Sequence, residues 1–157
     1  MSNPRDAFFL ELGELLWIER TLVFEVLPPA IEAVRDTELK EALSSHLEET
    51  RFHVARVEST FRAAGGEPTA ARSGALAGLK ADHESQDVRE PTLRDLQTAT
   101  ASIRVEQLEL AVYESVIGLA RVLHVDTGPL DQNRKDEEQA LKLLTKLADR
   151  LRDELPR

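Results

Sequence analysis

The stretch Arg104-Val105-Glu106-Gln107-Leu108-Glu109-Leu110 places two glutamates one turn apart within a segment of helical period. At about 100° per residue, Glu106 and Glu109 fall inside the apolar arc of that helix. The arc is made by Ile103, Leu110, Tyr113, Val116, Ile117 and Ala120. Two core-facing glutamates repel each other unless one is protonated or a cation lies between them. We therefore expect a helix inside a bundle, with either a cation or a salt-bridge network to Arg104 or Arg121.

Four long stretches of helical period make up most of the chain, and the absence of β-branched runs favours helix throughout. The turns between them contain Asp36-Thr37, Gly65-Gly66-Glu67-Pro68 and Asp126-Thr127-Gly128-Pro129. The four predicted helices run from about Asp6 to Val34, from Asp36 as an N-cap to Gly65, from about Pro91 to Leu123, and from about Pro129 to Leu155.

A long connection of small residues joins the second and third helices, from Pro68 to Glu90. One short helix is expected in it, over Ser73–Leu79. An up-and-down bundle needs only a short loop here, so the length favours the single crossover of a ferritin-like bundle. Pro28 and Pro29 predict a kink in the first helix, because each lacks a backbone donor. The prediction is an all-α, ferritin-like four-helix bundle, with residues 1–157 forming one domain.

The composition restricts the chemistry. The 157 residues include no cysteine, which excludes disulfides, thiolate metal sites and cysteine nucleophiles. The net charge of −9 argues against a nucleic-acid partner. The N-terminus lacks the layout of a signal peptide and no apolar run is long enough to cross a membrane, so we expect a cytoplasmic protein with no membrane contact.

The first helix carries Glu19 between Leu15 and Leu22, on the line that leads to Val26. An ionised carboxylate buried alone costs several kcal/mol, so Glu19 needs a partner or a cation. The alternative is a tilted helix that lets Glu19 reach solvent.

The second helix contains His46-Leu47-Glu48-Glu49-Thr50-Arg51-Phe52-His53. His46 and His53 lie near the centre of its apolar arc, and Glu49 lies at the edge, one turn from His53. Hydrogen-bonded core histidines are the alternative to a metal site. On the fourth helix, the stripe through Leu144, Ala148, Leu151 and Leu155 directs Glu137 inward and its neighbour Glu138 away.

Each of the four helices thus turns at least one carboxylate inward. A shared cation explains four such placements together, and oxygen ligands with one or two imidazoles are typical of di-iron and di-manganese bundles.

The sequence also resembles the YciF-type branch of the ferritin-like superfamily, along nearly its whole length. The resemblance rests on residues 14–19, 46–50, 104–109 and 144–148. It implies a bacterial, stress-related bundle, often dimeric, with a metal site made by the motif glutamates: Glu19, Glu49, Glu106, Glu109 and Glu137. His53 stands where relatives often carry glutamine and would add an imidazole. Phe52 and Leu141 occupy positions where ferritin spacing would put further ligands, so the site is expected to be incomplete on the side of the fourth helix.

Two functions follow from these residues. The first is a protein with two iron or manganese ions that reacts with a small oxidant, oxygen or peroxide, with Glu106 as the bridging ligand, Glu49 opposite, and Glu19 and Glu137 as terminal ligands. Tyr113 would then be a hydrogen-bonding neighbour of the site or a core residue.

The second function is a metal-free bundle that acts as a structural or protein-interaction module. Its acids would pair with Arg20, Arg51, Arg104 and Arg121, and Phe8, Phe9 and Trp17 would supply an apolar contact between the two copies of a homodimer.

Overall fold

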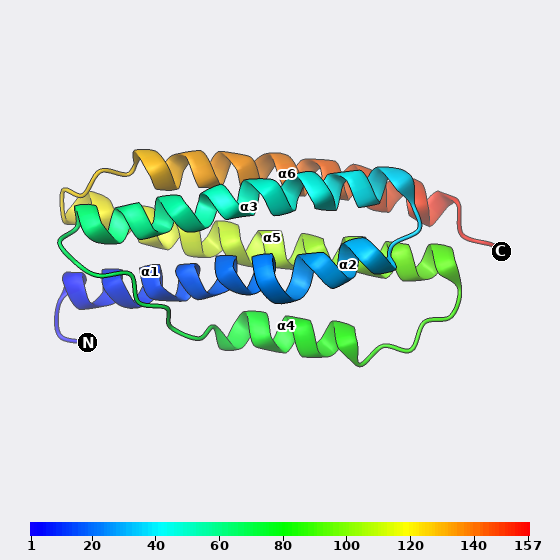
Figure 1. The fold of residues 1–157 in the computed structure, drawn as a ribbon, viewed down its shortest axis with the longest axis horizontal. Helices are drawn as coiled ribbons and strands as arrows, with labels where there is room; N and C mark the ends of the chain where they lie inside the picture. Colours follow the sequence, from blue (N-terminus) through cyan, green and yellow to red (C-terminus); the bar gives the residue numbers. More distant parts are fainter.

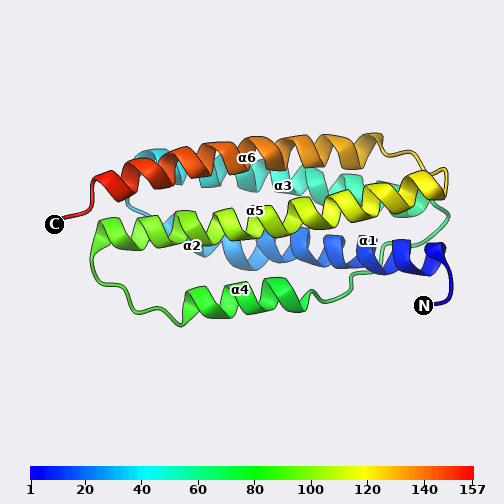
Figure 2. The same ribbon diagram turned by 180° about the vertical axis from the view of Figure 1, so that it is seen from behind.

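The computed structural model describes residues 1–157 and is entirely helical (Figure 1). The elements are α1 (Pro4–Thr21), the π-helical turn η1 (Leu22–Val26), α2 (Leu27–Ala33), α3 (Thr37–Ala63), α4 (Gly74–Glu84), α5 (Pro91–Val122) and α6 (Gly128–Asp153). The continuous rod of α1, η1 and α2 packs with α3, α5 and α6 as a four-helix bundle, and the two termini lie at opposite ends of it (Figure 1, Figure 2). The predicted all-α bundle with a long crossover is confirmed.

The helix starts follow local capping chemistry. The side chains of Asn3, Asp36 and Ser73 accept hydrogen bonds from backbone N–H groups in the first turns of α1, α3 and α4. Glu90 caps α5 in the same way, and Pro91 occupies the first position of that helix, where its missing N–H costs nothing.

The first predicted helix is interrupted near its prolines. Residues Leu22–Val26 form a π-helical turn, in which the Leu27 N–H donates to the Leu22 carbonyl five residues earlier. Pro28 and Pro29 then stand in the first turn of α2, where backbone donors have no partner within the helix. The π-helical turn thus begins three residues beyond Glu19, and the two prolines follow it at the start of α2.

The crossover lies outside the bundle. Its helix α4 begins after Ser73 as expected but extends to Glu84, beyond the predicted Leu79, and runs beside α5 (Figure 2). The chain leading to it passes close to α1, where the Ala71 N–H donates to the Gly13 carbonyl at 2.9 Å.

The apolar core falls into two clusters. One contains Leu22, Leu43, Val105 and Leu144, and the other contains Leu16, Val57, Tyr113 and Leu130. On each of the four bundle helices, buried glutamates or histidines lie where the residues of one cluster give way to those of the other. A polar layer therefore crosses the middle of the bundle.

Candidate metal centre

The polar layer receives side chains from every helix of the bundle. Its members are at most 5% exposed: Glu19 from α1, His46 and His53 from α3, Glu106 and Glu109 from α5, and Glu137 from α6. Four carboxylates and two imidazoles are thus removed from water within one slice of the molecule, where isolated charges would cost several kcal/mol each.

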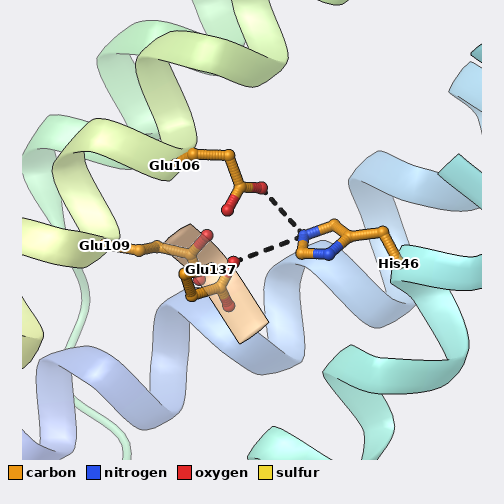
Figure 3. Close-up of side chains that lie close together, drawn as sticks. All are labelled: His46, Glu106, Glu109 and Glu137. Carbon is orange, nitrogen blue, oxygen red and sulfur yellow. Dashed lines mark ion pairs between the residues drawn. The ribbon is translucent and has the colours of Figure 1, made fainter. Parts of the chain in front are cut away.

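The first group of facing side chains is His46, Glu106, Glu109 and Glu137 (Figure 3). His46 Nε2 lies 2.8 Å from Glu106 Oε1 and 3.6 Å from Glu137 Oε2. One ligand atom from each of the four residues lies within 4.8 Å of the others. Two ligands on opposite sides of a cation with bonds of about 2.2 Å are about 4.4 Å apart, so small side-chain shifts would bring all four atoms to one cation.

The second group is Glu19, His53 and Glu137. His53 Nδ1 lies 2.8 Å from Glu137 Oε1 and 3.5 Å from Glu19 Oε1. Glu137 belongs to both groups, with one carboxylate oxygen near each histidine. The structure thus makes Glu137 the shared residue, a role that the sequence had suggested for Glu106.

The ring of His53 is oriented by a carboxylate outside these groups. His53 Nε2 lies 3.1 Å from Asp136 Oδ2, which Arg56 also contacts at 3.4 Å. With its Nε2–H donated to Asp136, a neutral His53 presents the Nδ1 lone pair to Glu19 and Glu137. Carboxylates hold metal-binding histidines in this tautomer. Sequence projection missed Asp136, although it directly precedes Glu137.

Most of the buried side-chain atoms that lack a hydrogen-bond partner belong to this layer. They include both oxygens of Glu109 and Glu137, both ring nitrogens of His46, and His53 Nδ1. Some of these atoms are close to an opposite charge, but the angles are not those of hydrogen bonds. Unpaired buried polar atoms are rare in folded proteins, and here they converge on common points. The residues present therefore fit a cation at each group.

The ionisation of the layer reflects the crowding of its charges. Burial, then Glu137 and Glu19, raise the pKa of Glu109 well above its ordinary value. Burial opposes the charged form of His46, but the neighbouring Glu106 raises the pKa of His46 well above the usual range. Burial likewise disfavours charged His53, yet the adjacent carboxylates of Glu137 and Glu19 raise its pKa to about 10. Without a cation, protons retained on His46, His53 and Glu109 therefore reduce the repulsion between the buried carboxylates.

A hydrogen-bonded chain reaches the layer from the surface. The Tyr113 hydroxyl donates to Glu19 Oε1 and accepts from Asn133 Nδ2 at 3.0 Å. Arg56, whose side chain is about one-third exposed, donates to Asn133 Oδ1 at 3.1 Å. Tyr113 is fully buried, and burial followed by the charge of Glu19 raises its pKa well above the usual range. It remains a neutral donor that holds one oxygen of Glu19.

Five of the six metal ligands predicted from the sequence meet in the layer: Glu19, His53, Glu106, Glu109 and Glu137. The sixth, Glu49, lies outside both groups, with a side chain that is 46% exposed and Oε2 3.7 Å from His46 Nδ1. His46, which the projection placed near the arc centre without assigning it as a ligand, stands in the first group instead.

The expected arginine networks do not reach the layer. Arg20 pairs with Glu58 at 3.0 Å and Arg51 pairs with Glu48, both outside it, and Arg104 and Arg121 are exposed. The N-terminal phenylalanines also face inward, because Phe8 is fully buried and the ring of Phe9 stacks on Phe61 with centroids 5.8 Å apart.

Among the helices of the structure, none combines the length and the apolar character that crossing a membrane requires.

The chain resembles two solved structures over almost its whole length. The stress protein YciF of E. coli has a TM-score of 0.91 and 22% identity, covering 99% of this chain and 100% of that one. YcfI from Rhodopseudomonas palustris, for which a structural role has been suggested, has a TM-score of 0.87 and 27% identity, covering 92% of this chain and 94% of that one. No curated protein matches the chain.

Residues 3–155 match the family described as "Domain of unknown function (DUF892)". The match covers nearly the whole chain, and the fold agrees with that of YciF. The protein is therefore a member of the DUF892 family, with the fold of YciF.

Proposed function

We propose that the protein holds two iron or manganese ions in the polar layer and reacts with oxygen or peroxide as part of a stress response. The observation that carries this proposal is the convergence of unpaired, fully buried carboxylate oxygens and imidazole nitrogens on two neighbouring points. Iron and manganese suit a ligand set of oxygen with a few nitrogens. The stress role is suggested by the description of the E. coli relative.

In this proposal, His46, Glu106 and Glu109 would hold one ion and Glu19 and His53 would hold the other, while Glu137, which belongs to both groups, would contribute to each. The four glutamates carry four negative charges, which two divalent cations balance while both histidines stay neutral. The His46 and His53 ring centroids are 6.4 Å apart, so the two groups are direct neighbours.

Two such ions supply redox chemistry toward dioxygen or peroxide. The chain's own contribution is to position ligands and move protons. Asp136 fixes the tautomer of His53, and Tyr113 donates a hydrogen bond to Glu19. Cation binding requires both histidines to release the protons that their raised pKa values otherwise retain.

Metal analysis of protein purified without chelator tests the proposal. We expect about two iron or manganese ions per chain, as in two-metal carboxylate bundles. Glu106→Ala should remove at least one of them, because Glu106 is 2% exposed and faces His46. Glu138→Ala is the matched control, since this glutamate is also in a bundle helix but is 58% exposed. Peroxide consumption by the loaded protein, compared with Glu106→Ala, tests reactivity separately.

A metal-free structural module is the second candidate function, favoured by the structural role suggested for the relative YcfI. In that case Glu106 and His46, 2.8 Å apart, form a buried ion pair with no cation to bind. Replacing both residues with leucine would then raise the melting temperature of a protein whose wild type contains no metal. That result would overturn the metal proposal.

A further inference from the structure

A cavity of about 230 Å³ opens beside the polar layer, on the side of the crossover. Its walls come from η1 and α2 on one side, from α4 on the second and from α5 on the third. The inner end is formed by His46 and Glu106, two members of the first group. The outer end includes Pro29, Ala33 and Glu84, which are exposed to solvent.

We propose that this cavity binds a small, neutral, largely apolar organic molecule and holds it against His46 and Glu106. The binding itself does not depend on the metal proposal. If cations are bound, the same position places this molecule beside the ion held by the first group.

The size of the cavity supports such an occupant. Apolar cavities of about 150 Å³ in other proteins stay dry and bind benzene. The present cavity is larger, at about 230 Å³, and so has the volume for a substituted benzene ring. The π-helical turn and the start of α2 shape one wall, because Leu22, Val26 and Pro29 all line the space.

The chemistry of the walls selects a neutral molecule. Leu22, Leu27, Leu76 and Val105 give an apolar surface, and the Ser102 hydroxyl is already donated to the Thr98 carbonyl at 2.9 Å. An anion would meet Glu106, with Glu109 and Glu137 behind it. At the outer end, Lys80 pairs with Glu84 at 2.7 Å, so this lysine is not free to attract a carboxylate.

Ligand binding to the full-length protein tests the inference, with toluene as the probe. We expect calorimetry to detect one saturable site that discriminates against benzoate, the anionic analogue of similar size. Ala101→Leu puts a larger side chain on the cavity wall of α5 and should weaken toluene binding at least tenfold. Ala111→Leu adds the same side chain at an exposed position of the same helix and should leave binding unchanged.

The inference is overturned if wild-type protein shows no saturable toluene binding, or if Ala101→Leu and Ala111→Leu bind toluene equally. Far-ultraviolet circular dichroism and melting temperatures establish that the variants are folded. If Ala101→Leu does not fold, crystals of the wild type under xenon decide the question, because xenon must then occupy the space between α2, α4 and α5. Density confined to other positions would overturn the inference.

Proton relaxation of bound toluene separates this inference from the metal proposal. Mn²⁺ in the first group should strongly accelerate relaxation, because the cavity ends at His46 and Glu106. Saturable toluene binding without any such acceleration would support the cavity site and contradict the metal site. A wild-type protein that binds two ions per chain but no toluene would support the metal site and contradict the cavity site.

Discussion

Glu109 has no hydrogen-bond partner within the chain for either of its carboxylate oxygens. Both oxygens are buried, and its raised pKa keeps it protonated when no cation is present. Glutamine has nearly the shape of a protonated glutamate. We therefore expect Glu109→Gln to leave the melting temperature of metal-free protein unchanged or raised, while lowering affinity for Mn²⁺ at least tenfold in calorimetry.

The matched control for Glu109→Gln is Glu114→Gln, an exposed position on the same helix. It should change neither property. A metal-free Glu109→Gln protein destabilised by more than about 2 kcal/mol would show that the acid has a structural partner, since that is the cost of an orphaned buried group.

Asp136 tests the orientation of His53. Its Oδ2 lies 3.1 Å from His53 Nε2, so the Asp136 charge stabilises the tautomer with Nδ1 free. Asp136→Asn keeps the size but removes the charge. We expect affinity for Mn²⁺ to fall about 10–100-fold, as for other carboxylates behind metal-binding histidines. Calorimetry checks this, with Glu138→Gln as the exposed neighbouring control; equal affinities would rule out an orienting role.

The sequence located the buried acids better than it located their partners. Helical period gives the direction of each Cβ, and this was enough to turn Glu19, Glu106, Glu109 and Glu137 inward. It does not give the distance to the facing helix. Glu49, at the edge of its apolar arc, is therefore partly exposed to solvent in the structure. Asp136 contacts His53, although a helical projection does not distinguish its position from a solvent-facing one.

At the scale of elements, the capping and turn residues predicted the helix boundaries well, and the 68–90 connection indicated the crossover. The π-helical turn before Pro28 could not be predicted, because it depends on how residues Leu22–Val26 pack rather than on their period. The full length of α4 was missed because its small residues carry little amphipathic signal; its contact with α5 stabilises it.

Gly13 lets the crossover pass close to α1. A Cβ atom at this position would lie 2.6 Å from the Thr69 carbonyl oxygen, which belongs to the backbone and cannot rotate away. We expect Gly13→Ala to destabilise the protein by about 1–3 kcal/mol in urea unfolding, despite the better helix propensity of alanine.

Gly118 gives the matched control, because a Cβ there meets nothing within 4 Å and the residue is exposed on α5. Gly118→Ala should stabilise the protein by about 0.5–1 kcal/mol. Equal effects of the two substitutions would mean that the crossover backbone at Thr69 moves away from Gly13 at little energetic cost.

For the whole molecule, the polar layer makes stability depend on protons when no cation is bound. The pKa of His53 is about 10 in the folded protein against 6.5 in the unfolded chain. The stabilisation from its proton is complete below pH 6.5 and is lost as the pH rises toward 10. Because the pKa values of Glu109 and Glu137 are also raised, their protons add stability that is likewise lost as the pH rises above 4.5. The lowered pKa of Glu106 matters only below that value.

We therefore expect the melting temperature of metal-free protein to fall between pH 6.5 and 8.5, with a free-energy slope of up to about 1.4 kcal/mol per pH unit for each retained proton. Mn²⁺ in the layer replaces these protons and should flatten the slope. His53→Gln should also flatten it in metal-free protein, whereas His83→Gln, a change outside the layer, should not. Scanning calorimetry at a series of pH values checks this. Parallel curves with and without Mn²⁺ would mean that the ion binds somewhere other than these buried acids and histidines.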